Sequence, residues 1–147
     1  MRKILSYLSM ALAIVPFLYV IFYLIETVRE YTEVLGKDLD GHAILTSMYI
    51  TLGLGTLLYS IVVALNVYLN VAALKETNGR SCLLYHVLAN ICNILVICGI
   101  ANIKATNYPI WMLYVVIANI LIIITAGLYR NRLVPKEAIV LKNEEDS

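Results

Sequence analysis

The sequence has little charge, and the charge it has is unevenly placed. Of the 147 residues, 14% are charged and 61% are hydrophobic. A typical soluble domain has about 25% charged and about 45–50% apolar residues. Four long runs contain no Asp, Glu, Lys or Arg at all, namely residues 4–25, 43–74, 81–103 and 105–129. This composition excludes an ordinary soluble domain and predicts a membrane protein.

Other absences exclude classes of function. Ion-coupled transporters commonly place a carboxylate or basic side chain inside the membrane, and none of the four runs has one. Cys82, Cys92 and Cys98 form no C-x-x-C pair, which disfavours thiol–disulfide exchange. The sequence shows no phosphate-binding glycine loop, zinc motif or nucleophile–base pair. We therefore expect no catalytic residue, no metal site and no cofactor, and predict that the chain is not an enzyme.

The four uncharged runs predict membrane-spanning helices. Each run exceeds the roughly 20 residues that a helix needs to cross a bilayer. Barrel strands would alternate polar and apolar residues over about ten positions, and these runs do not. The predicted fold class is all-α: an antiparallel bundle of four transmembrane helices in one domain, residues 1–130, with an outer loop over 26–42 and a tail over 131–147. The helical spacing of Val28, Tyr31 and Leu35 leaves open an extension of the first helix to Gly36.

Basic residues predict the orientation. With both termini in the cytoplasm, eight Lys and Arg residues lie on the inner side and three, Arg29, Lys37 and Lys104, on the outer side. This bias follows the positive-inside rule. We predict a multi-pass protein of the cell membrane with cytoplasmic termini. The second run is longer than a bilayer is thick, so the helix must tilt or project at one end, and the sequence does not decide which.

Polar side chains inside the uncharged runs form the candidate site. On a helix of about 3.6 residues per turn, His86, Asn90 and Asn93 fall within about 60° of one another. Asn66 and Asn70 are four residues apart and share a face of the second helix. Given the orientation, both sets lie in the cytoplasmic half of the bundle. The predicted intramembrane polar cluster is Asn66, Asn70, His86, Asn90, Asn93 and Asn119.

Two interpretations of this cluster stay open. In the first, the side chains join helix to helix, each hydrogen bond contributing about 0.6 kcal/mol and at most about 1.7 kcal/mol. In the second, they line a hydrated vestibule open to the cytoplasm, with Ser6 and Ser9 at a similar depth. A structural role is expected for His86. Gly53 and Gly55 are expected to be glycines at helix contacts.

Two classes of function remain. The first is a non-enzymatic accessory, regulatory or immunity-type subunit of a membrane complex, which acts through intramembrane helix–helix contacts. The alternative is a small homo-oligomeric channel or transporter with an Asn/His-lined path, better suited to a neutral solute than to ions. The expected partners are the lipid bilayer and another membrane protein or a second copy of the chain. A net charge of +1 implies no nucleic-acid partner.

Overall fold

Four long helices make up most of the protein in a computed structural model that describes residues 1–35, 39–103 and 110–133. Each of the four is long and apolar enough to cross a membrane. The prediction of an all-helical chain with four such helices is confirmed. The elements are α1 (Arg2–Leu35), α2 (Leu39–Lys75), α3 (Gly79–Ile103), α4 (Ile110–Leu128) and the short 3-10 helix η1 (Arg130–Arg132).

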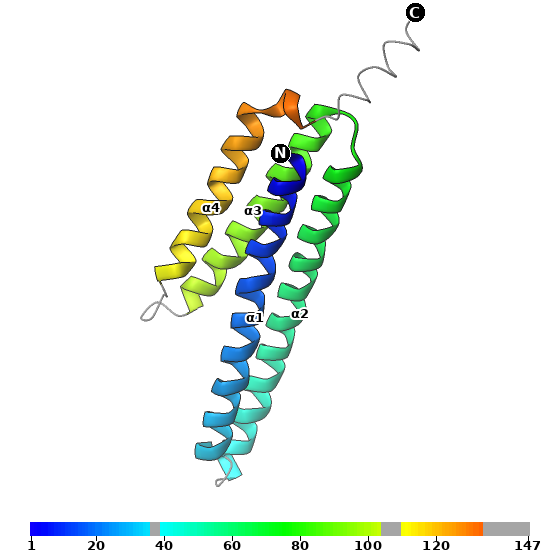
Figure 1. The fold of residues 1–147 in the computed structure, drawn as a ribbon. Helices are drawn as coiled ribbons and strands as arrows, with labels where there is room; N and C mark the ends of the chain where they lie inside the picture. Colours follow the sequence, from blue (N-terminus) through cyan, green and yellow to red (C-terminus); the bar gives the residue numbers. More distant parts are fainter. Residues whose placement is uncertain (36–38, 104–109, 134–147) are drawn as a thin grey trace, which may run out of the picture.

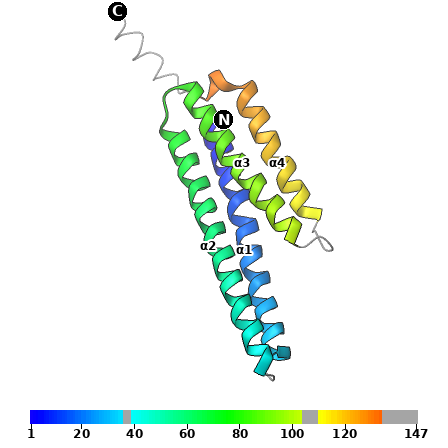
Figure 2. The same ribbon diagram turned by 180° about the vertical axis from the view of Figure 1, so that it is seen from behind.

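Consecutive helices run antiparallel and form an up-down-up-down bundle (Figure 1). Helix α1 packs against the other three long helices, and α3 packs against both α2 and α4. The start of α1 and helix η1 lie at the same end of the bundle in both views (Figures 1 and 2). We call this end the inner end, because the sequence predicts it to be cytoplasmic, and the opposite end the outer end.

Helices α1 and α2 extend well beyond α3 and α4 at the outer end (Figures 1 and 2). At about 1.5 Å per residue, the 37 residues of α2 measure about 56 Å and the 19 residues of α4 about 29 Å. The Tyr19 ring of α1 meets the Trp111 ring in the first turn of α4 edge to face, with 4.9 Å between centroids. Because α4 begins level with Tyr19, the rest of α1 extends beyond α4, and so does the N-terminal part of α2 that lies beside it. Residues 26–35, part of the expected loop, continue α1 as a helix.

The connection between α2 and α3 is fixed by local hydrogen bonds. The Glu76 carboxylate accepts bonds from the backbone N–H groups of Thr77 and Asn78, each at 2.9 Å. The side-chain oxygen of Asn78 accepts a bond from the backbone N–H of Arg80, also at 2.9 Å. Asn78 thus acts as the N-cap of α3, because its side chain satisfies a backbone donor that the first helical turn leaves free. These bonds hold α2 and α3 as antiparallel neighbours.

The bundle has apolar side chains on its outside. On α1 to α4 respectively, Ile4, Tyr68, Leu95 and Leu128 are between 66% and 76% exposed. A soluble protein places most such side chains in its core. Gly53 and Gly55 also face outward, since a Cβ added to either would meet no atom within 4 Å. The expectation that these glycines lie at a helix contact is therefore wrong within this chain.

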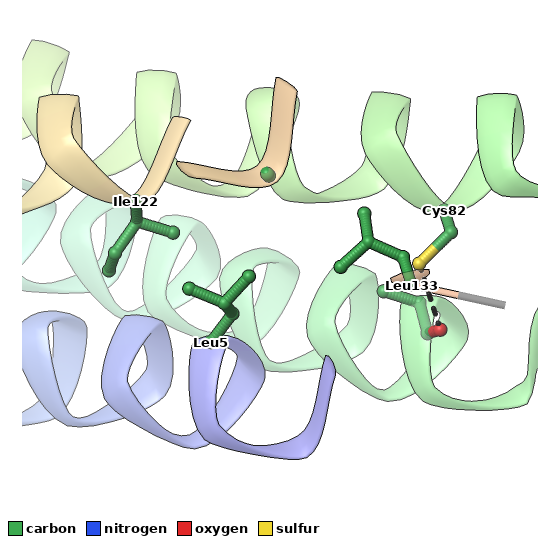
Figure 3. Packing of buried hydrophobic residues seen from close by; sticks show 6 residues of the cluster. Leu5, Cys82, Ile122 and Leu133 are labelled. Carbon is green, nitrogen blue, oxygen red and sulfur yellow. Dashed lines mark hydrogen bonds between the residues drawn. The ribbon is translucent and has the colours of Figure 1, made fainter. Parts of the chain in front are cut away.

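Two small apolar clusters lie inside the described part of the bundle. The inner cluster lies toward the inner end and contains Leu5, Ala73, Cys82, Ile122, Ala126 and Leu133 (Figure 3). Leu133 belongs to the expected cytoplasmic tail but is buried against the bundle. The outer cluster contains Ile97, Met112 and Val115. Much of the interior between these clusters is polar.

Candidate functional site

All six residues of the predicted polar cluster lie inside the bundle. Each is 0% exposed except Asn93, which is 4% exposed. Ser6 and Ser9 of α1 are also 0% exposed and lie among them. We call these eight residues the polar layer: Ser6, Ser9, Asn66, Asn70, His86, Asn90, Asn93 and Asn119. The layer draws on all four long helices, and none of its side chains lies on the outer surface.

Ser9 is the junction at which α1 and α2 meet. The Asn70 amide donates to the Ser9 hydroxyl oxygen at 3.1 Å, and the Asn66 amide donates to the same atom at 3.4 Å. Asn70 also donates to the side-chain oxygen of Asn66 at 3.1 Å. Asn66 then donates to the backbone carbonyl of Ala89 on α3 at 3.0 Å. Three helices are thereby joined through two amides of one face of α2.

A second pair of amides joins α3 to α4. The Asn93 amide donates to the side-chain oxygen of Asn119 at 3.2 Å, and to the backbone carbonyl of Ser9 at 3.4 Å. Asn119 donates to the carbonyl of Val115, one turn earlier on its own helix, at 2.8 Å. This pair lies on the outer-cluster side of the polar layer, because Val115 belongs to that cluster. Neither residue has a fully buried side-chain nitrogen or oxygen without a hydrogen-bond partner.

The inner part of the layer is not fully paired. Both ring nitrogens of His86, the Ser6 hydroxyl, and the side-chain oxygens of Asn70 and Asn90 have no hydrogen-bond partner among the residues that the structure describes. Asn90 uses its amide to donate to the His86 carbonyl at 2.7 Å. A buried polar atom without a partner costs about 1–3 kcal/mol. Five such atoms would together cost about 5–15 kcal/mol, which equals the stability of a typical protein.

Arg2 crosses the inner end of the bundle. Its guanidinium donates from Nη1 to the backbone carbonyl of Glu76 at 2.6 Å, which ties the start of α1 to the connection after α2. The Cys82 thiol donates to the Ala73 carbonyl nearby at 3.5 Å (Figure 3). Arg2 is also the charged group that acts electrostatically on both Cys82 and His86. The sequence shows Arg2 only as one basic residue of the N-terminus and gives no sign of this contact.

The chemistry of the layer is that of neutral hydrogen-bonding groups. Among the described residues, no three His, Cys, Asp or Glu side chains come together as a metal site would require. The layer joins helices, and its unpaired atoms leave hydrogen-bonding capacity unused. Comparisons with protein-family models, curated proteins and solved structures find no match to this chain.

Proposed function

We propose that the protein is a multi-pass protein of the cell membrane with both termini in the cytoplasm, and that it acts as a non-enzymatic accessory, regulatory or immunity-type subunit of a membrane complex. Its apolar outside and polar inside support insertion in the bilayer. Lipid tails can cover the outward side chains of the four helices, and the backbone of each helix satisfies its own hydrogen bonds. Lipid tails alone do not cover the part of the α1–α2 hairpin that extends beyond α3 and α4.

The observation that carries the subunit role is the outer end of the α1–α2 hairpin, which α3 and α4 leave uncovered. We call residues 26–34 and 43–52 the hairpin extension. The Thr32 and Tyr49 hydroxyls are 2.8 Å apart, so this part of α2 lies level with the charged turns of α1. Those turns carry Glu26, Arg29, Glu30 and Glu33, which favour water over hydrocarbon. The hairpin extension is therefore expected to stand above the bilayer core.

Apolar side chains remain exposed on the hairpin extension. Tyr31 and Val34 of α1 and Ile44 and Ile50 of α2 are between 49% and 73% exposed. Helices α3 and α4 stop short of this level, nearer the inner end, and do not cover them (Figure 2). Apolar surface that neither lipid nor the described part of the chain covers is typical of a protein–protein interface. We infer that another membrane protein covers it.

The two outward glycines add to this surface. Gly53 and Gly55 lie at the base of the hairpin extension with open space in front of them. Glycine on a helix surface lets a second helix approach closely, which strengthens packing in a membrane. The two glycines are about 160° apart around α2, so we propose that a helix of the partner packs against one of them, next to the exposed side chain of Leu54. The proposed contact is thus between a helix of the partner and α2, and it lies at the outer edge of the bilayer.

Site-specific photo-crosslinking in intact cells tests the proposal. A benzophenone amino acid is placed at Ile50 in the hairpin extension and, as a matched control, at Leu121, an exposed position on α4. We expect one heterologous membrane protein, identified by mass spectrometry, to be crosslinked from position 50 and not from position 121. Adducts with a second copy alone, or no protein adduct at position 50, would contradict the subunit role.

The unpaired atoms of the polar layer favour a second candidate function. A homo-oligomeric channel or transporter for a neutral solute would use polar groups that are not already bonded to one another, as those around His86 are not. A solute that crosses along the bundle axis has to pass both apolar clusters, so the side chains of each cluster must move apart. Stopped-flow measurement of solute entry into liposomes, with and without the protein, tests this candidate. Equal rates of entry would contradict it.

A further inference from the structure

Four of the eight polar-layer residues supply the five buried atoms that have no hydrogen-bond partner within residues 1–35, 39–103 and 110–133. They are Ser6, Asn70, His86 and Asn90, each 0% exposed. We call them the His86 site. The other four residues, including Asn93 and Asn119, have no such atom. The shortage of partners is therefore local and does not extend through the whole polar layer.

Interhelical contacts place these four side chains within about one helical turn of one another along the bundle axis. Helices α2 and α3 are antiparallel, and they are joined at Asn66–Ala89 and at Ala73–Cys82. On α2, Asn70 lies midway between Asn66 and Ala73. On α3, His86 lies between Cys82 and Ala89. Asn70 and His86 are therefore at the same height along the bundle.

The parallel helices α1 and α3 set the level of the remaining two residues. They meet where Asn93 donates to the Ser9 carbonyl. Three residues earlier on each helix, Ser6 therefore lies level with Asn90. Asn90 follows His86 by one turn and donates to its carbonyl. The His86 site is thus one region of the interior to which three helices contribute.

The chemistry of the unpaired atoms defines the missing partner. The side-chain oxygens of Asn70 and Asn90 only accept hydrogen bonds, so the partner must donate. A neutral imidazole has one donor and one acceptor nitrogen, so the partner must also accept. Two acceptor oxygens disfavour an anion, and the guanidinium of Arg2, one turn before Ser6 on α1, disfavours a cation. The partner is a small neutral molecule that both donates and accepts hydrogen bonds.

We infer that the His86 site is a binding site for internal water, which bridges His86 to Ser6, Asn70 and Asn90. Water is the smallest neutral molecule with both donors and acceptors. Folded proteins hold about one buried water per 27 residues, typically on polar atoms that lack other partners. The inference goes beyond the subunit role and holds whether or not a partner protein binds.

The site is closed at both ends in this structure. At the inner end lie the inner cluster and Arg2, whose bond to the Glu76 carbonyl ties α1 to the end of α2. At the outer end lie the Asn93–Asn119 pair and the outer cluster. The bound water is therefore enclosed, and Arg2 and the inner cluster separate it from the cytoplasmic side.

Water-edited solid-state NMR of the labelled protein in lipid bilayers tests the inference. The experiment follows the transfer of magnetisation from water to the Asn side-chain amides and the His rings. We expect the Asn70, Asn90 and His86 signals to grow in at shorter mixing times than the Asn119 signal, which is the matched buried and paired control. Equal growth at Asn90 and Asn119 would overturn the inference.

A variant of the site gives a second measurement. Ser6→Ala removes one hydroxyl from the His86 site with the least change in volume, and it is expected to slow the transfer of magnetisation to His86 in a folded protein. The matched Ser9→Ala variant alters the paired junction and should leave the transfer to His86 unchanged. A native mass spectrum with a retained small molecule, together with slow transfer at His86, would overturn water as the occupant.

Discussion

Replacing Asn66 by leucine tests whether the polar layer holds the bundle together. The Asn66 side chain takes part in three hydrogen bonds: it donates to the Ala89 carbonyl and the Ser9 hydroxyl, and it accepts from Asn70. In membrane proteins each such bond contributes about 0.6 kcal/mol, so their joint loss should lower the free energy of unfolding by about 2 kcal/mol. That is a large share of a total of about 5–15 kcal/mol.

The assay is reversible unfolding in mixed micelles, titrated with sodium dodecyl sulfate. Trp111 is the only tryptophan of the chain and packs against Tyr19, so its fluorescence reports the separation of α1 from α4. Circular dichroism follows helix content in parallel. The matched control is Tyr68→Leu, two residues along α2 on its exposed face, which should change the free energy of unfolding by less than about 0.5 kcal/mol.

A double-mutant cycle separates hydrogen bonding from a change in packing volume. Ser9→Ala removes the hydroxyl that both amides of α2 share. If the bonds stabilise the bundle, the effects of Ser9→Ala and Asn66→Leu should not add, because both variants remove the same Ser9–Asn66 bond. Full additivity, or an Asn66→Leu variant as stable as the parent, would refute a stabilising role for these bonds.

Three further predictions concern the remaining contacts and the orientation. Asn93→Leu removes one bond to α4 and one to a backbone carbonyl of α1, so the same titration should show a loss of about 1 kcal/mol; no loss would show that the α3–α4 contact depends on apolar packing alone. Tyr49→Phe removes an exposed bond to Thr32 and should change the free energy of unfolding by less than about 0.5 kcal/mol; a larger loss would mean that the hairpin extension is buried. In a variant without the native cysteines, Glu33→Cys should react with an impermeant thiol reagent on intact cells and Asn78→Cys only after permeabilisation; the reverse pattern would overturn the orientation.

The sequence determined the number, type and approximate extent of the helices. A helix satisfies its backbone hydrogen bonds within itself, so a long uncharged run is enough to predict one without knowledge of its neighbours. Periodicity also placed His86, Asn90 and Asn93 on one face of α3, because the helical repeat alone fixes which side chains share a face. These predictions depend only on residues near one another in the chain.

The tertiary structure decided which polar groups meet and which do not. Asn66 bonds to the backbone carbonyl of Ala89, and a carbonyl acceptor has no signature in the sequence. Gly53 and Gly55 turn outward, although glycines in a membrane helix commonly mark a contact. The unpaired atoms around His86 could not be predicted either. All of these depend on how far each helix is rotated and shifted along its axis against the others, and that is set by packing between segments distant in the sequence.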